Sequence, residues 1–201
     1  MELGLNGKVA LITGGSEGIG KATASSMASE GAQVIICARR SDVLDQAAKD
    51  IKLVAGGEIR TIQADVSQTG EIEELFKKII EIYGRVDILV NNAGTSAAGS
   101  ITKVSDEEWQ YDLDLKLFAA IRCSRLAIPH MIVNGGGRII NVTNLGGKAP
   151  GPNSMPTSVS RAAGIALTKA MSKDHAADNI LVNTVCIGFV NSGQNDRRWE
   201  K

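Results

Sequence analysis

Short apolar runs alternate with longer stretches of helical period along this chain, and this alternation restricts the fold more than any other feature. The apolar runs span residues 9–13, 33–37, 58–63, 87–91, 138–142 and 181–186. They are rich in Val and Ile and apolar on both faces, as parallel strands covered on both sides are. The helical stretches span residues 18–30, 41–55, 68–83, 105–131 and 158–175. Six strands and five helical crossovers predict an α/β protein with a doubly wound parallel sheet.

The length of 201 residues suits one domain, so we expect residues 1–201 to fold as a single unit. A hydrophobic content of 43% with 22% charged residues is ordinary for a soluble globular protein. The N-terminus lacks the apolar core of a signal peptide, and no run is long enough to span a membrane. The cysteines, Cys37, Cys123 and Cys186, are odd in number and widely spaced, which favours a reducing cytoplasm over a disulfide framework.

Charge and composition also narrow the range of partners. The 22 Lys and Arg balance the 22 Asp and Glu, so the chain has no net positive field to attract a nucleic acid or an anionic membrane. His130 and His175 have no partners at metal-ligand spacing, and we expect no metal site. A small molecule is therefore the expected ligand.

The first apolar run leads directly into a glycine-rich turn, GGSEGIG at residues 14–20, and then into a helical stretch. Glycines at such positions allow a sharp turn, let backbone N–H groups approach an anion, and let helix and strand pack closely. A helix N-terminus favours negative charge. The order of strand, turn and helix predicts a Rossmann-like dinucleotide site rather than a merely tight turn.

The second apolar run ends in Cys-Ala-Arg-Arg at residues 37–40, where a carboxylate is expected if the cofactor has a free ribose 2′-hydroxyl. Guanidinium groups match a phosphate in charge and geometry, so Arg39 and Arg40 favour NADP(H) over NAD(H). The alternative is that both are solvated surface charges. Glu17 in the glycine turn would also repel a nearby phosphate.

Several motifs in the right order resemble the short-chain dehydrogenase/reductase family. Residues 13–20 are similar to its TGxxxGxG turn, residues 91–94 read NNAG, and the pair Asp65 and Val66 is similar to the pair that contacts adenine. The resemblance covers about residues 8–192. It implies a nicotinamide cofactor, an alcohol or carbonyl substrate, and a homo-oligomer formed through the fourth and fifth crossover helices. The implied cofactor contacts are Gly14, Ser16, Glu17, Gly18, Ile19, Gly20, Arg39, Arg40, Asp65, Val66, Asn92, Ala93, Gly94, Arg161, Gly188 and Ser192.

The resemblance also implies a set of four residues, Asn, Ser, Tyr and Lys, that handle the proton and hold the substrate oxygen. Aligning this chain through residues 137–142 and 160–164 places Asn144 at the serine position and Thr157 at the tyrosine position. Arg161 falls at the lysine position and Asp114 at the asparagine position. All four expected residue types are absent, so the site is atypical.

Each replacement changes the chemistry expected of its position. The hydroxyl of Thr157 is far less acidic than a phenol. Arg161 stays protonated, so it can hold ribose hydroxyls but cannot shuttle a proton. The amide of Asn144 can still polarise a carbonyl oxygen. Asp114 and Arg161 are complementary in charge, and we hypothesise that they form a buried ion pair; the alternative is two unrelated surface substitutions.

Few other side chains could replace the missing acid. Tyr111 lies three positions before Asp114, hence on the same helical face, although packing is its simpler role. Tyr83 is expected far from the carboxyl ends of the strands. Lys148 lies in the glycine-rich segment 144–157, which is expected to be a functional loop rather than a plain connection.

The last part of the chain departs from the family pattern. A Pro-Gly pair is replaced by Ile-Gly at residues 187–188, with Ser192 at a carboxamide-binding position. The chain stops at Lys201, before the seventh strand and last helix that family members usually carry, so the sixth strand should form an apolar sheet edge. We expect the substrate pocket to draw on residues 95–97, 148–156 and the segment after Gly188.

Two functions fit these patterns. The first is an NADP-dependent oxidoreductase for a small carbonyl or alcohol, in which Asn144 polarises the oxygen and Thr157, a water molecule or Tyr111 manages the proton. The second is an inactive NADP-binding sensor or partner subunit. The glycine turn and the NNAG motif are compatible with both.

Overall fold

The main sheet has six parallel strands in the order β3-β2-β1-β4-β6-β8. The computed structural model describes residues 3–190. The strand order reverses between β1 and β4, and in such sheets a ligand crevice opens at the carboxyl ends of the strands at this point. The strands are β1 (Val9–Thr13), β2 (Gln33–Ala38), β3 (Ile59–Gln63), β4 (Ile88–Asn91), β6 (Gly137–Asn144) and β8 (Ile180–Ile187). The predicted doubly wound, Rossmann-like α/β sheet is confirmed.

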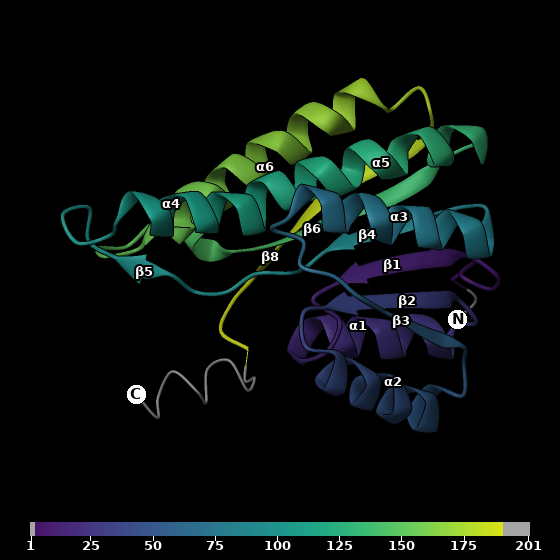
Figure 1. Ribbon diagram of the computed structural model, residues 1–201. Coiled ribbons are helices and arrows are strands. Elements are labelled where there is room, and N and C mark those ends of the chain that lie inside the picture. The colour runs from purple at the N-terminus through teal and green to yellow at the C-terminus, as the bar shows by residue number, and fades with distance from the viewer. Residues whose placement is uncertain (1–2, 191–201) are drawn as a thin grey trace.

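Helices cover the two faces of this sheet in separate layers (Figure 1). On one face lie α1 (Gly18–Ser29) and α2 (Ser41–Ala55), which pack on each other. On the other face lie α3 (Thr69–Tyr83), α5 (Ala119–Val133) and α6 (Thr157–Asp174). The five crossovers between the strands therefore wind in two halves about β1 and β4.

The alternation of side chains along β1 builds both layers of the core. Val9 and Leu11 belong to the cluster formed with α3 and α5, whereas Ala10 and Ile12 belong to the cluster formed with α1 and α2. All four are at most 1% exposed. A strand buried on both faces has no polar side, which is why β1 reads as a continuous apolar run.

The longest predicted helix, residues 105–131, is divided in the structure. It consists of α4 (Asp106–Leu113), a π-helical turn at Asp114–Phe118, and α5. Ser105 and Glu108 form a capping box at the start of α4. The wide turn between the two helices rotates the side chains that follow it, so helical faces counted from α4 do not continue into α5.

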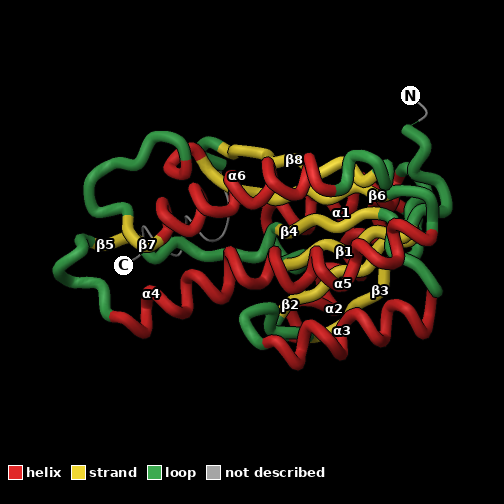
Figure 2. The backbone as a smooth tube through the Cα atoms, turned by 90° about the horizontal axis from the view of Figure 1, so that it is seen from above, coloured by secondary structure: helices red, strands yellow, loops and turns green. Residues whose placement is uncertain are grey.

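A second, two-stranded sheet was missed by the sequence patterns. Strand β5 (Ala98–Gly99) pairs antiparallel with β7 (Met155–Pro156), beyond the main sheet and close to α4 (Figure 2). Each strand has only two residues, too few for a period to be visible in the sequence. This small sheet ties the segment after the NNAG motif to the start of α6.

Strand β8 is the edge of the main sheet in the described part of the chain, as expected. Leu181 and Val185 on one of its faces remain 46% and 48% exposed.

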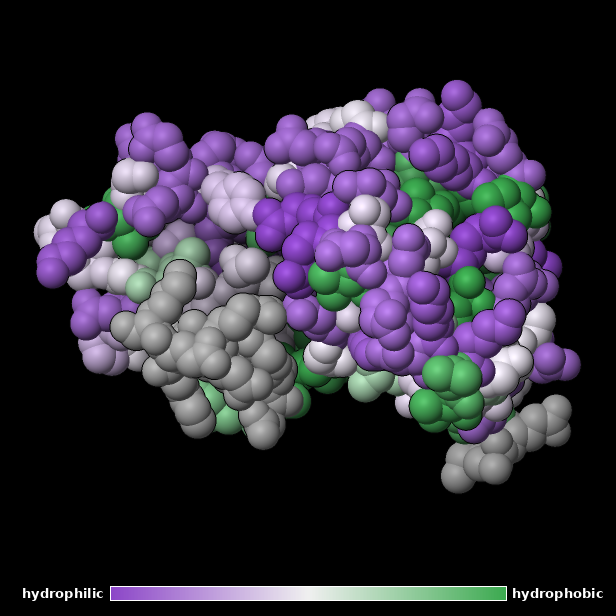
Figure 3. Space-filling view, turned by 60° about the horizontal axis from the view of Figure 1, so that its bottom comes forward, coloured by the Kyte–Doolittle hydropathy of each residue, from purple (hydrophilic) through white to green (hydrophobic). Residues whose placement is uncertain are grey.

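The side of the molecule on which α2 lies is hydrophilic over most of its area, with hydrophobic residues in several separate places (Figure 3). None of the helices described between residues 3 and 190 is both long and apolar enough to cross a bilayer.

Candidate active site

A crevice of about 950 Å³ opens at the carboxyl ends of the strands. It brings together nearly all of the predicted cofactor and catalytic residues, from the glycine turn at one end to Asn144, Thr157 and Arg161 at the other. The residues that line it are Gly14, Ser16, Glu17, Gly18, Ile19, Cys37, Ala38, Arg39, Arg40, Ala64, Asp65, Val66, Asn92, Ala93, Gly94, Thr95, Ser96, Ala98, Leu115, Val142, Thr143, Asn144, Thr157, Arg161, Ile187, Gly188, Phe189 and Val190.

Four of the predictions about site residues are not confirmed by the residues that line the crevice. Asp114 and Gly20 do not line the crevice, and Ser192 lies outside the described residues. Of the expected substrate segments, residues 95, 96 and 187–190 contribute, but none of residues 148–156 does. The loop 144–157 thus reaches the crevice only through its two end residues.

The glycine turn is shaped so that a larger residue does not fit at several of its positions, Gly14 and Gly20 among them. Gly14 has φ +66°, and a Cβ there would lie 2.9 Å from the Cα of Ala93. A Cβ on Gly20 would lie 2.3 Å from the carbonyl oxygen of Gly14 and 2.5 Å from the side-chain nitrogen Nδ2 of Asn92. Gly20 therefore acts by letting α1 start directly against the turn, which leaves the helix N-terminus facing the crevice.

The NNAG segment fixes the turn from the other side. The Oγ1 of Thr13 accepts hydrogen bonds from the backbone N–H groups of Asn92 (3.0 Å) and Ala93 (3.1 Å). The side-chain amide of Asn92 donates to the carbonyl oxygens of Thr13 and Gly14. These bonds connect the ends of β1 and β4, so the turn is held rigid at the point where the strand order reverses.

The two guanidinium groups at the end of β2 have different surroundings. Arg40 pairs with Glu17 at 2.8 Å, which offsets the negative charge that the glycine turn would otherwise present. Arg39 donates to the hydroxyl of Tyr111 at 2.8 Å, and in residues 3–190 no carboxylate lies within ion-pair distance of it. Both line the crevice, so Arg39 is the group available to an additional phosphate.

Asp65 is held in place by neighbours on both sides. Its Oδ1 accepts hydrogen bonds from the backbone N–H and the hydroxyl of Ser67, and its own N–H donates to Glu71. Asp65 and the buried Val66 line the crevice next to the end of β2. The carboxylate is thus positioned to accept a hydrogen bond from a ligand in this part of the crevice.

A buried polar cluster lies at the other end, and sequence analysis missed three of its four members. The Nζ of Lys116 donates to the Oγ1 of Thr157 at 2.8 Å and also pairs with Asp112. Asp112 further accepts hydrogen bonds from Ser160 (2.6 Å) and Thr157 (3.2 Å). The side chains of Lys116 and Asp112 are each only 1% exposed. Thr157 alone of the four lines the crevice.

A sequence signal for this cluster exists, although it is weak. Asp112 and Lys116 are four residues apart, the spacing of an intrahelical ion pair. Such pairs are usually solvated, so the spacing by itself does not indicate burial. The inward rotation of Lys116 results from the π-helical turn at Asp114–Phe118, which no periodicity argument anticipates.

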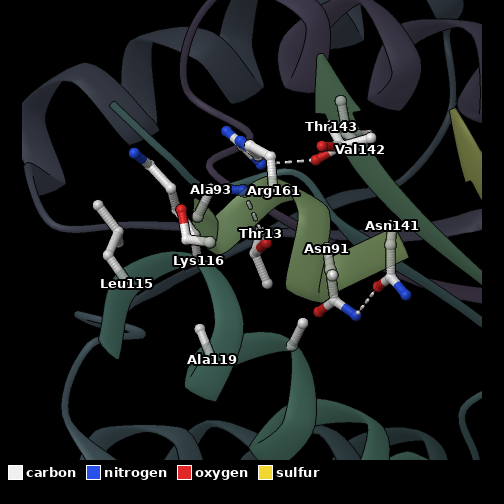
Figure 4. Close-up of a pocket in the computed structure, with 13 residues that line it drawn as sticks. Thr13, Asn91, Ala93, Leu115, Lys116, Ala119, Asn141, Val142, Thr143 and Arg161 are labelled. Carbon is white, nitrogen blue, oxygen red and sulfur yellow. Dashed lines mark hydrogen bonds between the residues drawn. The ribbon is translucent and has the colours of Figure 1, made fainter. Parts of the chain in front are cut away.

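The hypothesised ion pair between Asp114 and Arg161 was wrong. Asp114 accepts hydrogen bonds from Arg122 (3.0 Å) and Gln110 (2.8 Å), on the side of the helix that faces away from the crevice lining. Arg161 instead donates to the carbonyl oxygen of Val142 at 2.7 Å (Figure 4). Asp114 lies on the π-helical turn and Arg161 on α6, and each has other hydrogen-bond partners, so their complementary charges do not pair.

Burial lowers the pKa values of two cationic side chains, Lys116 and Arg161. It lowers the pKa of Lys116 to about 8, against the opposing effect of Asp112, and the charge of Arg161 lowers it further. Burial also lowers the pKa of Arg161, which Asp112 partly opposes. The Nε of Arg161 has no hydrogen-bond partner among the described residues. Because Arg161 forms no ion pair with a carboxylate of residues 3–190, it is well suited to neutral or anionic acceptors on a ligand.

Two further features complete the geometry. The Oδ1 of Asn144 is buried and has no hydrogen-bond partner among the described residues, although Asn144 lines the crevice. A small cavity of about 20 Å³, lined in part by Lys116, Arg161 and Asn141, adjoins the polar cluster. The side-chain amide of Asn91 donates a hydrogen bond of 2.8 Å to Asn141, which links β4 to β6 at the cavity wall (Figure 4).

Comparison with known proteins agrees with this geometry. Residues 8–201 match the family model described as short chain dehydrogenase. The chain belongs to the short-chain dehydrogenase family. A 3-oxoacyl-(acyl-carrier-protein) reductase from Synechocystis sp. is 35% identical over 187 residues, which are 92% of this chain and 75% of the relative.

Solved structures of the family superimpose closely. The L-sorbose reductase from Gluconobacter frateurii, complexed with NADPH and L-sorbose, is 35% identical with a TM-score of 0.93, covering 96% of this chain and 73% of that one. An actinorhodin polyketide ketoreductase with NADPH is 34% identical with a TM-score of 0.93, covering 96% and 75%. Within this short-chain dehydrogenase, the crevice occupies the place at which the fold binds its ligand.

Proposed function

We propose that this short-chain dehydrogenase is an NADPH-dependent reductase of a small carbonyl compound. The observation that carries the proposal is that one crevice holds a diphosphate-type glycine turn, a guanidinium (Arg39) that pairs with no carboxylate of residues 3–190, and a hydroxyl and an amide at its far end. The NADPH-bound L-sorbose reductase and polyketide ketoreductase, both close in fold, support it.

The residues of the crevice fit this cofactor. The absence of Cβ atoms at Gly14 and Gly20 leaves the turn open to a pyrophosphate at the N-terminus of α1. Arg39 would bind the 2′-phosphate, while Asp65 would accept a hydrogen bond from the adenine amine. Arg161 would donate to hydroxyls of the nicotinamide ribose. Bound NADPH would supply the hydride for reduction.

The substrate oxygen is placed by the two residues that replace the usual serine and tyrosine. Asn144 lines the crevice, and the N–H groups of its side-chain amide can donate to a carbonyl oxygen. Thr157 presents its hydroxyl to the crevice while its Oγ1 is fixed by the N–H of Ala97 at 3.1 Å. Donors held in this way stabilise negative charge that develops on a carbonyl oxygen.

The rival function, an inactive NADP-binding sensor or partner subunit, has one observation in its favour. The sequence contains only two tyrosines, and neither lines the crevice. Tyr83 packs against the core cluster, and Tyr111 bonds to Arg39. Reduction by this protein therefore requires a proton source other than a phenol.

Cofactor and substrate assays separate the two functions. NADPH and NADH are titrated against the purified protein by fluorescence, and NADPH absorbance is then followed with ketones, quinones and oxoacyl thioesters. We expect NADPH to bind more tightly than NADH and at least one carbonyl to be reduced. Tight NADPH binding without turnover of any carbonyl would support the sensor instead.

Self-association through α4–α5 and α6 stays a prediction. Ile132 and Val133 at the end of α5 are 46% and 86% exposed, and Phe118 is 38% exposed. Exposed apolar residues on one helix are compatible with a contact between subunits. Light scattering coupled to gel filtration measures the mass directly, and a monomer at micromolar concentration would contradict the prediction.

A further inference from the structure

The buried cluster next to Thr157 contains a titratable group that the proposed function has not used. Lys116 lies on the π-helical turn and does not line the crevice, but it donates a hydrogen bond to Thr157, which does, so a ligand there would meet the hydroxyl and not the ammonium. The Oγ1 of Thr157 accepts from Lys116 at 2.8 Å and from the N–H of Ala97 at 3.1 Å. Its own proton is then directed either to Asp112, at 3.2 Å, or into the crevice.

Among the described residues that line the crevice beside Thr157, no other side chain is suited to supply a proton at neutral pH. Arg161 does not give up its proton in this range. Asn144 has no acidic proton, and an aliphatic hydroxyl such as that of Thr157 is a poor acid unless its proton is replaced as it leaves. Lys116 already donates a hydrogen bond to this hydroxyl, so it is oriented to replace that proton.

We propose that Lys116 drives proton delivery to the substrate oxygen through the hydroxyl of Thr157, in place of a tyrosine. The proposal rests on the proposed reductase function and adds the route of its proton. In this arrangement Thr157 touches the substrate, and Lys116 acts through it. Asp112 positions the ammonium, and Ser160 in turn holds Asp112 at 2.6 Å.

The step balances as a two-electron reduction. The carbonyl carbon accepts a hydride from the reduced nicotinamide, and the carbonyl oxygen accepts the hydroxyl proton of Thr157. The oxygen of Thr157 takes a proton from the Nζ of Lys116, which becomes a neutral amine. The product is an alcohol and the oxidised cofactor. Lys116 regains its proton from solvent, and the adjoining cavity of about 20 Å³ has room for one water molecule on that path.

The charges around Lys116 suit this role. The groups that face it are Asp112 on the same helical segment and Arg161 on α6. Burial lowers the pKa of Lys116 to about 8, close to the pH at which a group that gives and regains a proton works best. An ordinary exposed lysine, with a pKa near 10.4, would release its proton much less readily.

The variants separate charge from proton transfer. Lys116→Arg keeps a positive charge beside Asp112 but cannot release a proton, whereas Thr157→Ser keeps the hydroxyl and Thr157→Val removes it. Lys21→Arg is the matched control, because Lys21 also pairs with an aspartate, Asp50, at 2.6 Å but does not line the crevice. Each variant is assayed for NADPH affinity, melting temperature and the pH profile of kcat.

We expect wild-type kcat for reduction to fall as the pH rises through about 8, because the amine loses the proton that it must donate. Lys116→Arg and Thr157→Val should each lose about 100-fold or more in kcat, the usual size of an acid–base contribution, with NADPH affinity preserved. Thr157→Ser, which retains a hydroxyl, should lose much less of the rate than Thr157→Val and should keep the dependence on pH. Lys21→Arg should match the wild type.

A readout independent of turnover comes from NMR of 13C-labelled lysine in the protein without substrate. One lysine signal should titrate near pH 8, disappear in Lys116→Arg and move in Thr157→Val but not in Thr157→Ser. If the wild type reduces a carbonyl while Lys116→Arg retains its rate and pH profile, the proton route is overturned and the reductase function stands. If the wild type binds NADPH but reduces nothing, the reductase function fails and takes the proton route with it.

Discussion

The guanidinium of Arg39, which lines the crevice, donates a hydrogen bond of 2.8 Å to the hydroxyl of Tyr111 and so connects the end of β2 with α4. Because Tyr111 is neutral, this contact orients Arg39 without cancelling its charge. Arg40, by contrast, is paired with Glu17. The selectivity for the 2′-phosphate of NADPH should therefore depend mainly on Arg39.

Arg39→Ala should weaken NADPH binding about 10- to 100-fold, since a hydrogen bond to a charged group contributes about 1.5–3 kcal/mol. NADH affinity should change little, because NADH has no 2′-phosphate. Tyr111→Phe should cause a smaller loss, since it removes the orienting bond but not the charge. Fluorescence titration with both cofactors measures the ratio. Arg60→Ala, on β3 outside the crevice lining, is the control, and an equal loss for NADH would contradict the assignment.

Gly20→Ala tests the packing of the phosphate-binding turn. The new Cβ would lie 2.3 Å from the carbonyl oxygen of Gly14, so the turn must shift and NADPH affinity should fall at least tenfold. Stability should fall as well, by about 1–3 kcal/mol as for other overpacked sites. The matched control is Gly70→Ala in the first turn of α3, where no atom lies within 4 Å of the new Cβ.

Gly70→Ala should instead raise the free energy of unfolding, by about 0.4–1 kcal/mol, because alanine restricts the unfolded chain. Urea denaturation of both variants gives the comparison. Equal NADPH affinities for the two would show that the close contact at Gly20 does not shape the crevice.

The parts of this molecule that the sequence predicts well are those with a regular period or a local rule. The β1 run is apolar throughout because both of its faces are buried. The helix predicted over residues 41–55 has the bounds of α2, because its amphipathic period ends at Gly56, which has φ +69°. The glycine turn is equally easy to recognise, because its motif lies within seven consecutive residues. Such features need no knowledge of the rest of the chain.

The polar cluster could not be predicted in the same way. The placement of Lys116 depends on an i→i+5 turn in the middle of an otherwise helical segment, and that turn is a product of tertiary packing. Its partner Thr157 is 41 residues away in the sequence. The complementary charges of Asp114 and Arg161 suggested a contact, but charge alone does not fix which way each side chain faces.

Thiol reactivity tests the burial of the crevice wall. Cys37 lines the crevice but is fully buried, and desolvation raises its pKa to about 12, slightly opposed by a hydrogen bond from the backbone of Gly14. Burial likewise raises the pKa of Cys123. Because the thiolate is the reactive form, neither should react with a thiol reagent in the native protein at pH 8.

Cys186, which is partly exposed on β8, should be the one that reacts. Titration with a chromogenic disulfide should therefore give one rapid thiol per chain in the native state and three after denaturation. Mass spectrometry identifies the modified residue. Rapid labelling of Cys37 would show that the β2 end of the crevice opens more than the structure indicates.

The ion pair between Lys116 and Asp112 also makes a prediction about stability. Both side chains are buried, so removing one partner leaves the other without a counter-charge, and Lys116→Met or Asp112→Leu alone should cost about 3–5 kcal/mol. The double variant leaves no uncompensated charge and should cost less than the sum of the two. A coupling energy of about 1–3 kcal/mol is expected for residues in direct contact. Urea unfolding of the wild type, the two single variants and the double variant measures this coupling energy. If the losses in free energy of unfolding of the single variants add up to that of the double variant, the two charges do not interact in the folded state.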